Sequence, residues 1–433
     1  MDKNLLRNPP IIPSHPNPMN RFFTLLILAL ISSSIFAQGI NLNQGSIKQK
    51  KYLQKIPYQN INGMLVVPVS IHGKTYNFVL DTGAPLAISD KLFKELNLQI
   101  ITQTEVEDAD GARKEMKMIS LPELHLQGIT FLNTPGFVHH EKSDDYFNLF
   151  ECFEIDGIIG SNMLRNSVVQ FDEPNKQISI TDNFKKLATK GMVYKAQRMF
   201  LPDMQASPCF EIGLQMGEQR IIETVLFDTG DRGFYSMSTR CYNYIYEHEH
   251  AVINSIAESE GSFAWGAHGV FEKQKYLLLQ VPELVLFINR TTFNDVVVTT
   301  TNAPNSRIGS KLLQYGKVTL DYKKKLFFYE PFENINTGEL SKMPWAISPA
   351  FQNDKLVVGI IWDKALEQQI NLGDEVLSVD GVDIQSMDLC EYVNFANSSS
   401  NNTSSNEELI LELKDLNTGE IKKVAIKRLQ LNE

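Results

Sequence analysis

The chain carries the tripeptide Asp-Thr-Gly twice, and each copy follows an apolar run with the pattern of a β-strand. The first copy is Asp81-Thr82-Gly83, and the second is Asp228-Thr229-Gly230. Two carboxylates brought close together cannot both ionise, so they share a proton. One carboxyl group can then activate a water molecule while the other polarises a carbonyl group, without a metal or a cofactor. A single copy is equally typical of an ordinary β-turn.

The spacing of other motifs shows that the two copies belong to an internal duplication. Asp81 and Asp228 lie 147 residues apart, while Gly160 and Gly309 lie 149 apart, as do Asp172 and Asp321. Ile-Gly-Ser recurs at 159–161 and 308–310. Strand-like runs separated by short Gly-containing turns precede each copy, which indicates a mainly β fold made of two similar halves.

Each half resembles a retropepsin-type aspartic peptidase unit. That family's pattern is two apolar residues, Asp-Thr-Gly-Ala or -Ser, a flap hairpin, and an apolar-apolar-Gly segment. Residues 79–84, 108–111 and 158–160 carry it in the first half, and residues 226–230, 261–269 and 307–309 in the second. The resemblance spans about residues 60–332. It implies two β-barrel lobes that form a pseudo-dimer within one chain, as in pepsin-like enzymes.

The resemblance also implies roles for individual residues. Asp81 and Asp228 would be the catalytic dyad, titrating as a coupled pair. The residues of the supporting turns would be Thr82, Gly83, Ala84, Thr229 and Gly230. The flap candidates would be Asp110, Gly111, Gly261 and Gly266.

Two residues of the second half depart from the family pattern. Asp231 replaces the usual Ala or Ser, and would either raise the pKa values of the dyad or lie outside it on the turn. Arg307 stands where the family prefers an apolar residue. These departures leave two alternatives to an active endopeptidase. One is an inactive peptide-binding pseudoprotease, and the other is an envelope scaffold.

The pattern changes after Pro331. Residues 333–345 resemble a linker, and residues 346–433 resemble a PDZ domain of the bacterial protease-associated type. Gly373-Asp374 precedes a strand and Asp380-Gly381 forms a turn, as in that family. The resemblance implies a small α+β domain with a possible peptide groove beside Leu356–Ile361. A small β-rich cap without a peptide site is the alternative. We expect a chain that ends near Pro331 to keep its chemistry on short peptides.

The N-terminal region predicts export. Residues 1–37 have the features of a signal peptide: Arg21, a short apolar run at Phe22–Ile31, and a plausible cleavage site after Ala37. A single membrane anchor is the alternative. Residues 38–60 are then a lead-in, residues 61–190 the first lobe and residues 191–332 the second. After signal removal we expect no stable membrane span, and a periplasmic, cell-envelope or extracellular location.

Composition limits the partners and cofactors. The formal charge of −10 and the pI of about 5.4 argue against a nucleic-acid partner and leave a peptide or protein substrate. Four cysteines allow three complete disulfide pairings, and the sequence does not choose among them. No metal site is expected, because His248 and His250 lack a third ligand at useful spacing.

Overall fold

The computed structural model describes residues 41–107, 113–139, 152–188, 195–202, 204–216, 218–249, 253–262, 265–266, 269–270, 273–353, 355–388, 390–395 and 407–431. All features below belong to the compact unit Leu42–Glu433. The predicted signal peptide lies outside the described residues, as do the flap candidates Asp110 and Gly111. In the part of the chain that is described, no helix is long and apolar enough to cross a membrane.

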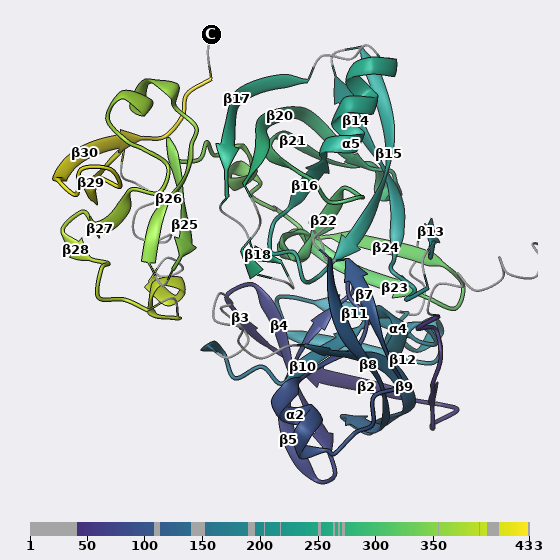
Figure 1. Ribbon diagram of the computed structural model, residues 1–433. Helices are drawn as coiled ribbons and strands as arrows, with labels where there is room; N and C mark the ends of the chain where they lie inside the picture. The colour runs from purple at the N-terminus through teal and green to yellow at the C-terminus, as the bar shows by residue number, and fades with distance from the viewer. Residues whose placement is uncertain are drawn as a thin grey trace, which may run out of the picture. The chain divides into compact units, whose positions relative to one another are not determined.

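The first lobe is a sheet of parallel and antiparallel strands (Figure 1). On β4, residues 64–67 are all buried, as are Phe78, Val79 and Leu80 on β5. Such continuous apolar runs are typical of strands covered on both faces. The hairpin turns at His72-Gly73 and Gln127-Gly128 have positive φ at both positions, as the sequence predicts for tight β-hairpins. Its elements are β1 (Ser46–Ile47), β3 (Gln59–Ile61), β4 (Met64–Ile71), β5 (Lys74–Asp81), β6 (Ala87–Ser89), α2 (Asp90–Glu95), β7 (Thr102–Glu107), β8 (Arg113–Leu126), β9 (Ile129–His139), β10 (Gly157–Gly160) and α4 (Ser161–Leu164).

The second lobe repeats this plan. A hairpin of β14 and β15 corresponds to β4 and β5, and β15 pairs in parallel with β22 as β5 does with β10. Its elements are β14 (Cys209–Met216), β15 (Gln219–Asp228), β16 (Tyr235–Ser238), α5 (Thr239–Tyr244), a π-helical turn (Ile245–Glu249), β17 (Asn254–Gly261), β18 (Trp265–Gly266), β19 (Gly269–Val270), β20 (Gln274–Leu286), a 3₁₀ turn (Ile288–Arg290), β21 (Thr291–Thr301), β22 (Arg307–Gly309) and a 3₁₀ turn (Ser310–Gln314).

A shared sheet joins the two lobes. Its strands follow the order β13-β24-β23-β11-β12-β2 within the described residues, and β13 also pairs with β14 of the second lobe. Gln170 on β11 pairs with Thr319 on β23, and its Nε2 donates to Thr319 Oγ1 at 3.0 Å. These residues are 149 apart, the repeat distance of the duplication, so the pseudo-twofold axis passes between them. The strands are β2 (Leu53–Pro57), β11 (Val168–Asp172), β12 (Gln177–Thr181), β13 (Gln197–Phe200), β23 (Gly316–Asp321) and β24 (Leu326–Pro331).

The C-terminal region, residues 346–431, forms its own sheet in the order β25-β26-β27-β29-β30. Asp374 is fully buried, where it accepts hydrogen bonds from two backbone N–H groups and pairs with Lys422 Nζ at 2.7 Å. The elements are β25 (Ile347–Gln352), β26 (Lys355–Ile361), a 3₁₀ turn (Lys364–Gln368), β27 (Glu375–Val379), β28 (Val382–Asp383), a helical stretch at 390–395, β29 (Glu408–Lys414) and β30 (Ile421–Lys427).

This strand order corrects one expectation from the sequence. The predicted groove beside Leu356–Ile361 assumed that this strand offers a free edge. The strand is β26, which pairs with β25 along its length and with β27 at Val357, so it is not the edge strand of this sheet. The strand at that edge of the sheet is β25, which follows the linker directly.

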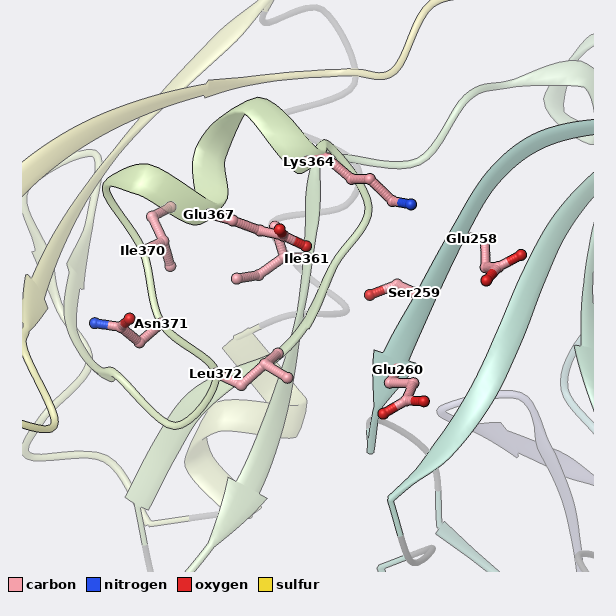
Figure 2. A pocket seen from close by; sticks show the side chains of 9 residues that line it. All are labelled: Glu258, Ser259, Glu260, Ile361, Lys364, Glu367, Ile370, Asn371 and Leu372. Atoms are coloured by element: carbon pink, nitrogen blue, oxygen red, sulfur yellow. The ribbon is translucent and has the colours of Figure 1, made fainter.

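The C-terminal region packs against β17 and β20 of the second lobe. Tyr276 and Leu278 on β20 form a buried cluster with Ile360 and Trp362, and the Ser262 N–H donates to the Gly359 carbonyl at 3.1 Å. A pocket of about 420 Å³ lies at this junction, and Figure 2 shows Ser259 on β17 pointing toward the segment after β26.

One disulfide reaches this region from the first lobe. Cys152, just before β10, is bonded to Cys390, with a Cα–Cα distance of 5.2 Å and a sequence separation of 238 residues. Cys209 is buried and Cys241 is half-buried, and neither is in a disulfide.

Candidate active site

The two Asp-Thr-Gly segments meet at the ends of equivalent strands. Asp81 is the last residue of β5 and Asp228 is the last residue of β15. Gly160 pairs with Asp81, and Gly309 pairs with Asp228, across the parallel strand pairs. A side chain at Gly160 would lie 2.2 Å from the Pro85 backbone, which explains why the apolar-apolar-Gly motif ends in glycine.

The two carboxyl groups lie against each other and are hydrogen-bonded. Each also lies over the glycine of the opposite copy. A Cβ atom added to Gly83 would fall 2.5 Å from Asp228 Cγ, and one added to Gly230 would fall 2.3 Å from Asp81 Oδ2. Glycine is therefore required at both positions for the carboxyl groups to approach.

Backbone N–H groups orient both aspartates in the same way. Asp81 Oδ1 accepts from the N–H groups of Gly83 at 2.8 Å and Ala84 at 3.1 Å. Asp228 Oδ1 accepts from Gly230 at 2.9 Å and from the residue after it at 3.3 Å. In each case the two N–H groups bind Oδ1, so the same oxygen of each aspartate is held by its own turn.

The two threonines lock the segments together. Thr82 Oγ1 donates to the Phe227 carbonyl at 2.6 Å and accepts from the Thr229 N–H at 3.0 Å. Thr229 Oγ1 donates to the Leu80 carbonyl at 2.8 Å and accepts from the Thr82 N–H at 3.0 Å. Both side chains are fully buried, so these bonds are shielded from water.

Burial raises the pKa values of both aspartates above the ordinary range, and it is the largest cause for each. The negative charge of Asp228 raises the pKa of Asp81 further. The Arg307 guanidinium opposes the rise in the pKa of Asp228, while Asp231 adds to it. The site thus favours one proton shared between the two groups.

The structure brings Asp231 and Arg307 to this site as well. Asp231 lies on the turn after β15 and faces Arg307. Both expectations for Asp231, a raised dyad pKa and a place on the turn outside the dyad, are therefore met in part. Its charge raises the pKa of Asp228, yet its own side-chain oxygens accept hydrogen bonds from Gly233 on the turn and Ser236 on β16.

Sequence reasoning missed a second pair of supporting residues. Ser161 Oγ donates to the Gln205 carbonyl at 2.8 Å, and Ser310 Oγ donates to the Asp231 carbonyl at 3.0 Å. Gln205 Nε2 donates to the Gly83 carbonyl at 2.9 Å. The repeated Ile-Gly-Ser motif was the available signal for the serines.

Two of the flap candidates, Gly261 and Gly266, lie within the described residues. Gly261 ends β17 against the C-terminal region, where an added Cβ would fall 2.0 Å from the Gly359 carbonyl oxygen. Gly266 lies in the short β18–β19 hairpin. Within the described ranges, no group of three or more His, Cys, Asp or Glu side chains is arranged to hold a metal ion.

Part of the first lobe matches a known protein family in sequence. Residues 67–163 match the family described as aspartyl protease, a range that includes Asp81 and ends before the second copy. An aspartic proteinase from Irpex lacteus of known structure is similar over 65% of this chain and 98% of its own, with 12% sequence identity and a TM-score of 0.38. A search of curated proteins finds no match.

Proposed function

We propose that this chain is an aspartic endopeptidase that hydrolyses peptide bonds through a water molecule held between Asp81 and Asp228. The observation that carries the proposal is the pair of buried, hydrogen-bonded carboxyl groups, each packed on the glycine of the opposite Asp-Thr-Gly. One ionised carboxyl group accepts a proton from water, and the protonated one donates a hydrogen bond to the scissile carbonyl. Neither aspartate forms a covalent bond to the substrate, so the reaction has no covalent intermediate.

The surrounding residues serve this chemistry by fixing positions. Backbone N–H groups hold the Oδ1 atoms, so the Oδ2 atoms keep a constant orientation toward the water. The threonine bonds keep the two lobes in register, which preserves the spacing of the carboxyl groups. Such preorganisation lowers the reorganisation needed in the transition state.

We further propose that the protein is exported and that residues 346–433 are a PDZ-like domain. The Cys152–Cys390 disulfide supports an oxidising location, because such bonds are rare in reducing compartments. The position of β25 at the edge of its sheet supports capture of an extended peptide through backbone pairing.

Turnover of a denatured protein tests the catalytic proposal. The expected result is cleavage at acidic to near-neutral pH that is blocked by a pepstatin-type inhibitor. Binding of the same protein without cleavage would instead support a peptide-binding pseudoprotease. If the denatured protein is neither cleaved nor bound, the result would favour an envelope scaffold.

A further inference from the structure

The two lobes differ at two positions beside the dyad, and in both cases the second lobe carries the charge. Ala84 follows the first Asp-Thr-Gly, whereas Asp231 follows the second. Ile158 on β10 and Arg307 on β22 are also equivalent, because each pairs with the residue two positions before its lobe's aspartate. One half of the duplicated scaffold therefore carries an acidic and a cationic residue at neighbouring positions where the other half carries Ala84 and Ile158.

These two added charges are in contact with each other and with the dyad. Arg307 Nη1 lies 3.8 Å from Asp228 Oδ2, and Arg307 Nε lies 4.0 Å from Asp231 Oδ2. A further nitrogen, Nη2, donates to Thr301 Oγ1 at 3.5 Å. The side chains of Arg307 and Asp228 are only 11% and 10% exposed, so solvent ions screen their interaction weakly.

Asp231 is held in place by donors on its own side of the site. Its Oδ1 accepts from the Gly233 N–H at 2.7 Å, and its Oδ2 accepts from Ser236 Oγ at 3.3 Å. A carboxylate fixed in this way holds a negative charge 4.0 Å from Arg307 Nε.

The charged groups around Asp228 come from three elements. Asp81 faces it from β5, Asp231 from the turn after β15, and Arg307 from β22. Arg232, on the same turn as Asp231, is exposed and donates to the Asn62 carbonyl of the first lobe at 3.4 Å. Arg307 is thus the cation that lies against the dyad, and it lies on the Asp228 side.

We propose that Arg307, anchored by Asp231, is a positioning residue that fixes the negative charge of the dyad on Asp228 and leaves the proton on Asp81. The catalytic roles that this inference gives to Asp81 and Asp228 rest on the proposed peptidase function. Asp228 is then the base that activates water, and Asp81 is the acid that polarises the carbonyl. In a symmetric pair either aspartate could take either role, whereas here the added charges choose between them.

The directions of the pKa shifts agree with this assignment. Arg307 lowers the pKa of Asp228, while the charge on Asp228 raises the pKa of Asp81. The pH dependence then has a definite sign. Activity rises as Asp228 ionises and falls at higher pH as Asp81 loses its proton.

The location of the proton can be measured without any turnover. An epoxide alkylates an ionised carboxylate, whereas a diazo ester esterifies a protonated carboxylic acid. After treatment of the intact protein at mildly acidic pH, peptide mapping by mass spectrometry identifies the modified aspartate. In the wild type we expect the epoxide on Asp228 and the diazo ester on Asp81. In Arg307→Ile, which copies the first lobe, we expect each reagent to divide between the two aspartates.

The pH profile of kcat/KM provides a second readout. Arg307→Ile should move the acidic limb of the profile to higher pH by about one unit or more, because ionised Asp228 loses the adjacent cation that stabilises its charge. Arg307→Lys keeps the positive charge, so its acidic limb should stay close to that of the wild type. Thermal unfolding of each variant checks that the fold is retained.

Two results would overturn the inference. One is identical labelling of the wild type and a folded Arg307→Ile variant. The other is an acidic limb that stays unchanged in that variant. An inactive wild type that still shows the expected labelling would reject the peptidase function while retaining the charge assignment.

Discussion

Thr82 and Thr229 exchange hydrogen bonds across the junction of the two lobes, each hydroxyl accepting the other's N–H at 3.0 Å. Each hydroxyl also donates to a carbonyl of the opposite lobe. The same four contacts therefore join the lobes and set the distance between the two aspartates, so stability and the proposed peptidase activity should depend on one feature.

Loss of one hydroxyl should weaken both properties. Thr82→Ala leaves the buried Phe227 carbonyl and Thr229 N–H without their partner, which should lower the free energy of unfolding by about 2 kcal/mol. Peptidase activity should fall as well, because the dyad is no longer held in register. Thr82→Ser keeps the hydroxyl and is the matched control. Chemical denaturation and kcat/KM measure the two effects, and equal values for the Ala and Ser variants would contradict this role.

The raised pKa of Asp81 makes stability depend on pH. The folded protein favours the protonated carboxyl group, so this contribution is complete below the unfolded-state pKa of about 3.9 and is lost as pH rises through the folded pKa. Asp81→Asn should therefore be more stable than the wild type at neutral pH and similar to it at about pH 3. Melting temperatures across pH test this.

Asp415 provides a control of opposite sign. Its pKa is lowered by Lys422, so its contribution to stability is present at neutral pH and is lost as pH falls. Asp415→Asn should not stabilise the protein at neutral pH. If both substitutions shift the melting temperature in the same direction at neutral pH, burial of the dyad is not the cause of the first effect.

The sequence predicted the strands and turns whose signals are local. The Ser89 cap at the start of α2 and the two positive-φ hairpin turns are confirmed, because capping and turn chemistry act within a few residues. The structure also places the predicted aspartates at the ends of β5 and β15 and brings them together.

The sequence did not predict which distant segments come into contact. The Cys152–Cys390 bond spans 238 residues, and no spacing rule selects it from the possible pairings. The contact of Arg307 with Asp231 depends on which strands pair in parallel. The error over the free edge of the C-terminal sheet has the same origin, since strand order is a property of the assembled sheet.

The packing of the C-terminal region revises the expectation for truncation. A chain that ends at Pro331 would expose Tyr276 and Leu278, which are each 2% exposed in the whole protein. Loss of burial costs about 1.5–3 kcal/mol for a large apolar side chain. We therefore expect the truncated chain to lose activity on short peptides as well as on proteins, measured as kcat/KM for both.

A point substitution separates packing from loss of the whole region. Gly261→Ala places a Cβ 2.0 Å from the Gly359 carbonyl oxygen and should displace β17 from the C-terminal region. Gly338→Ala in the linker, where the nearest atom would be 3.2 Å away, is the control. Full short-peptide activity in both the truncated chain and Gly261→Ala would show that residues 333–433 are independent of the catalytic fold.

The central claim is that Asp81 and Asp228 act together as one catalytic pair. The most direct test is turnover of a denatured protein by the wild type, Asp81→Asn and Asp228→Asn, with folding of each verified by circular dichroism. Because the two carboxyl groups have different roles, each variant should lose about a thousandfold or more of kcat. Near-wild-type turnover by a folded Asp228→Asn variant would contradict the two-aspartate mechanism.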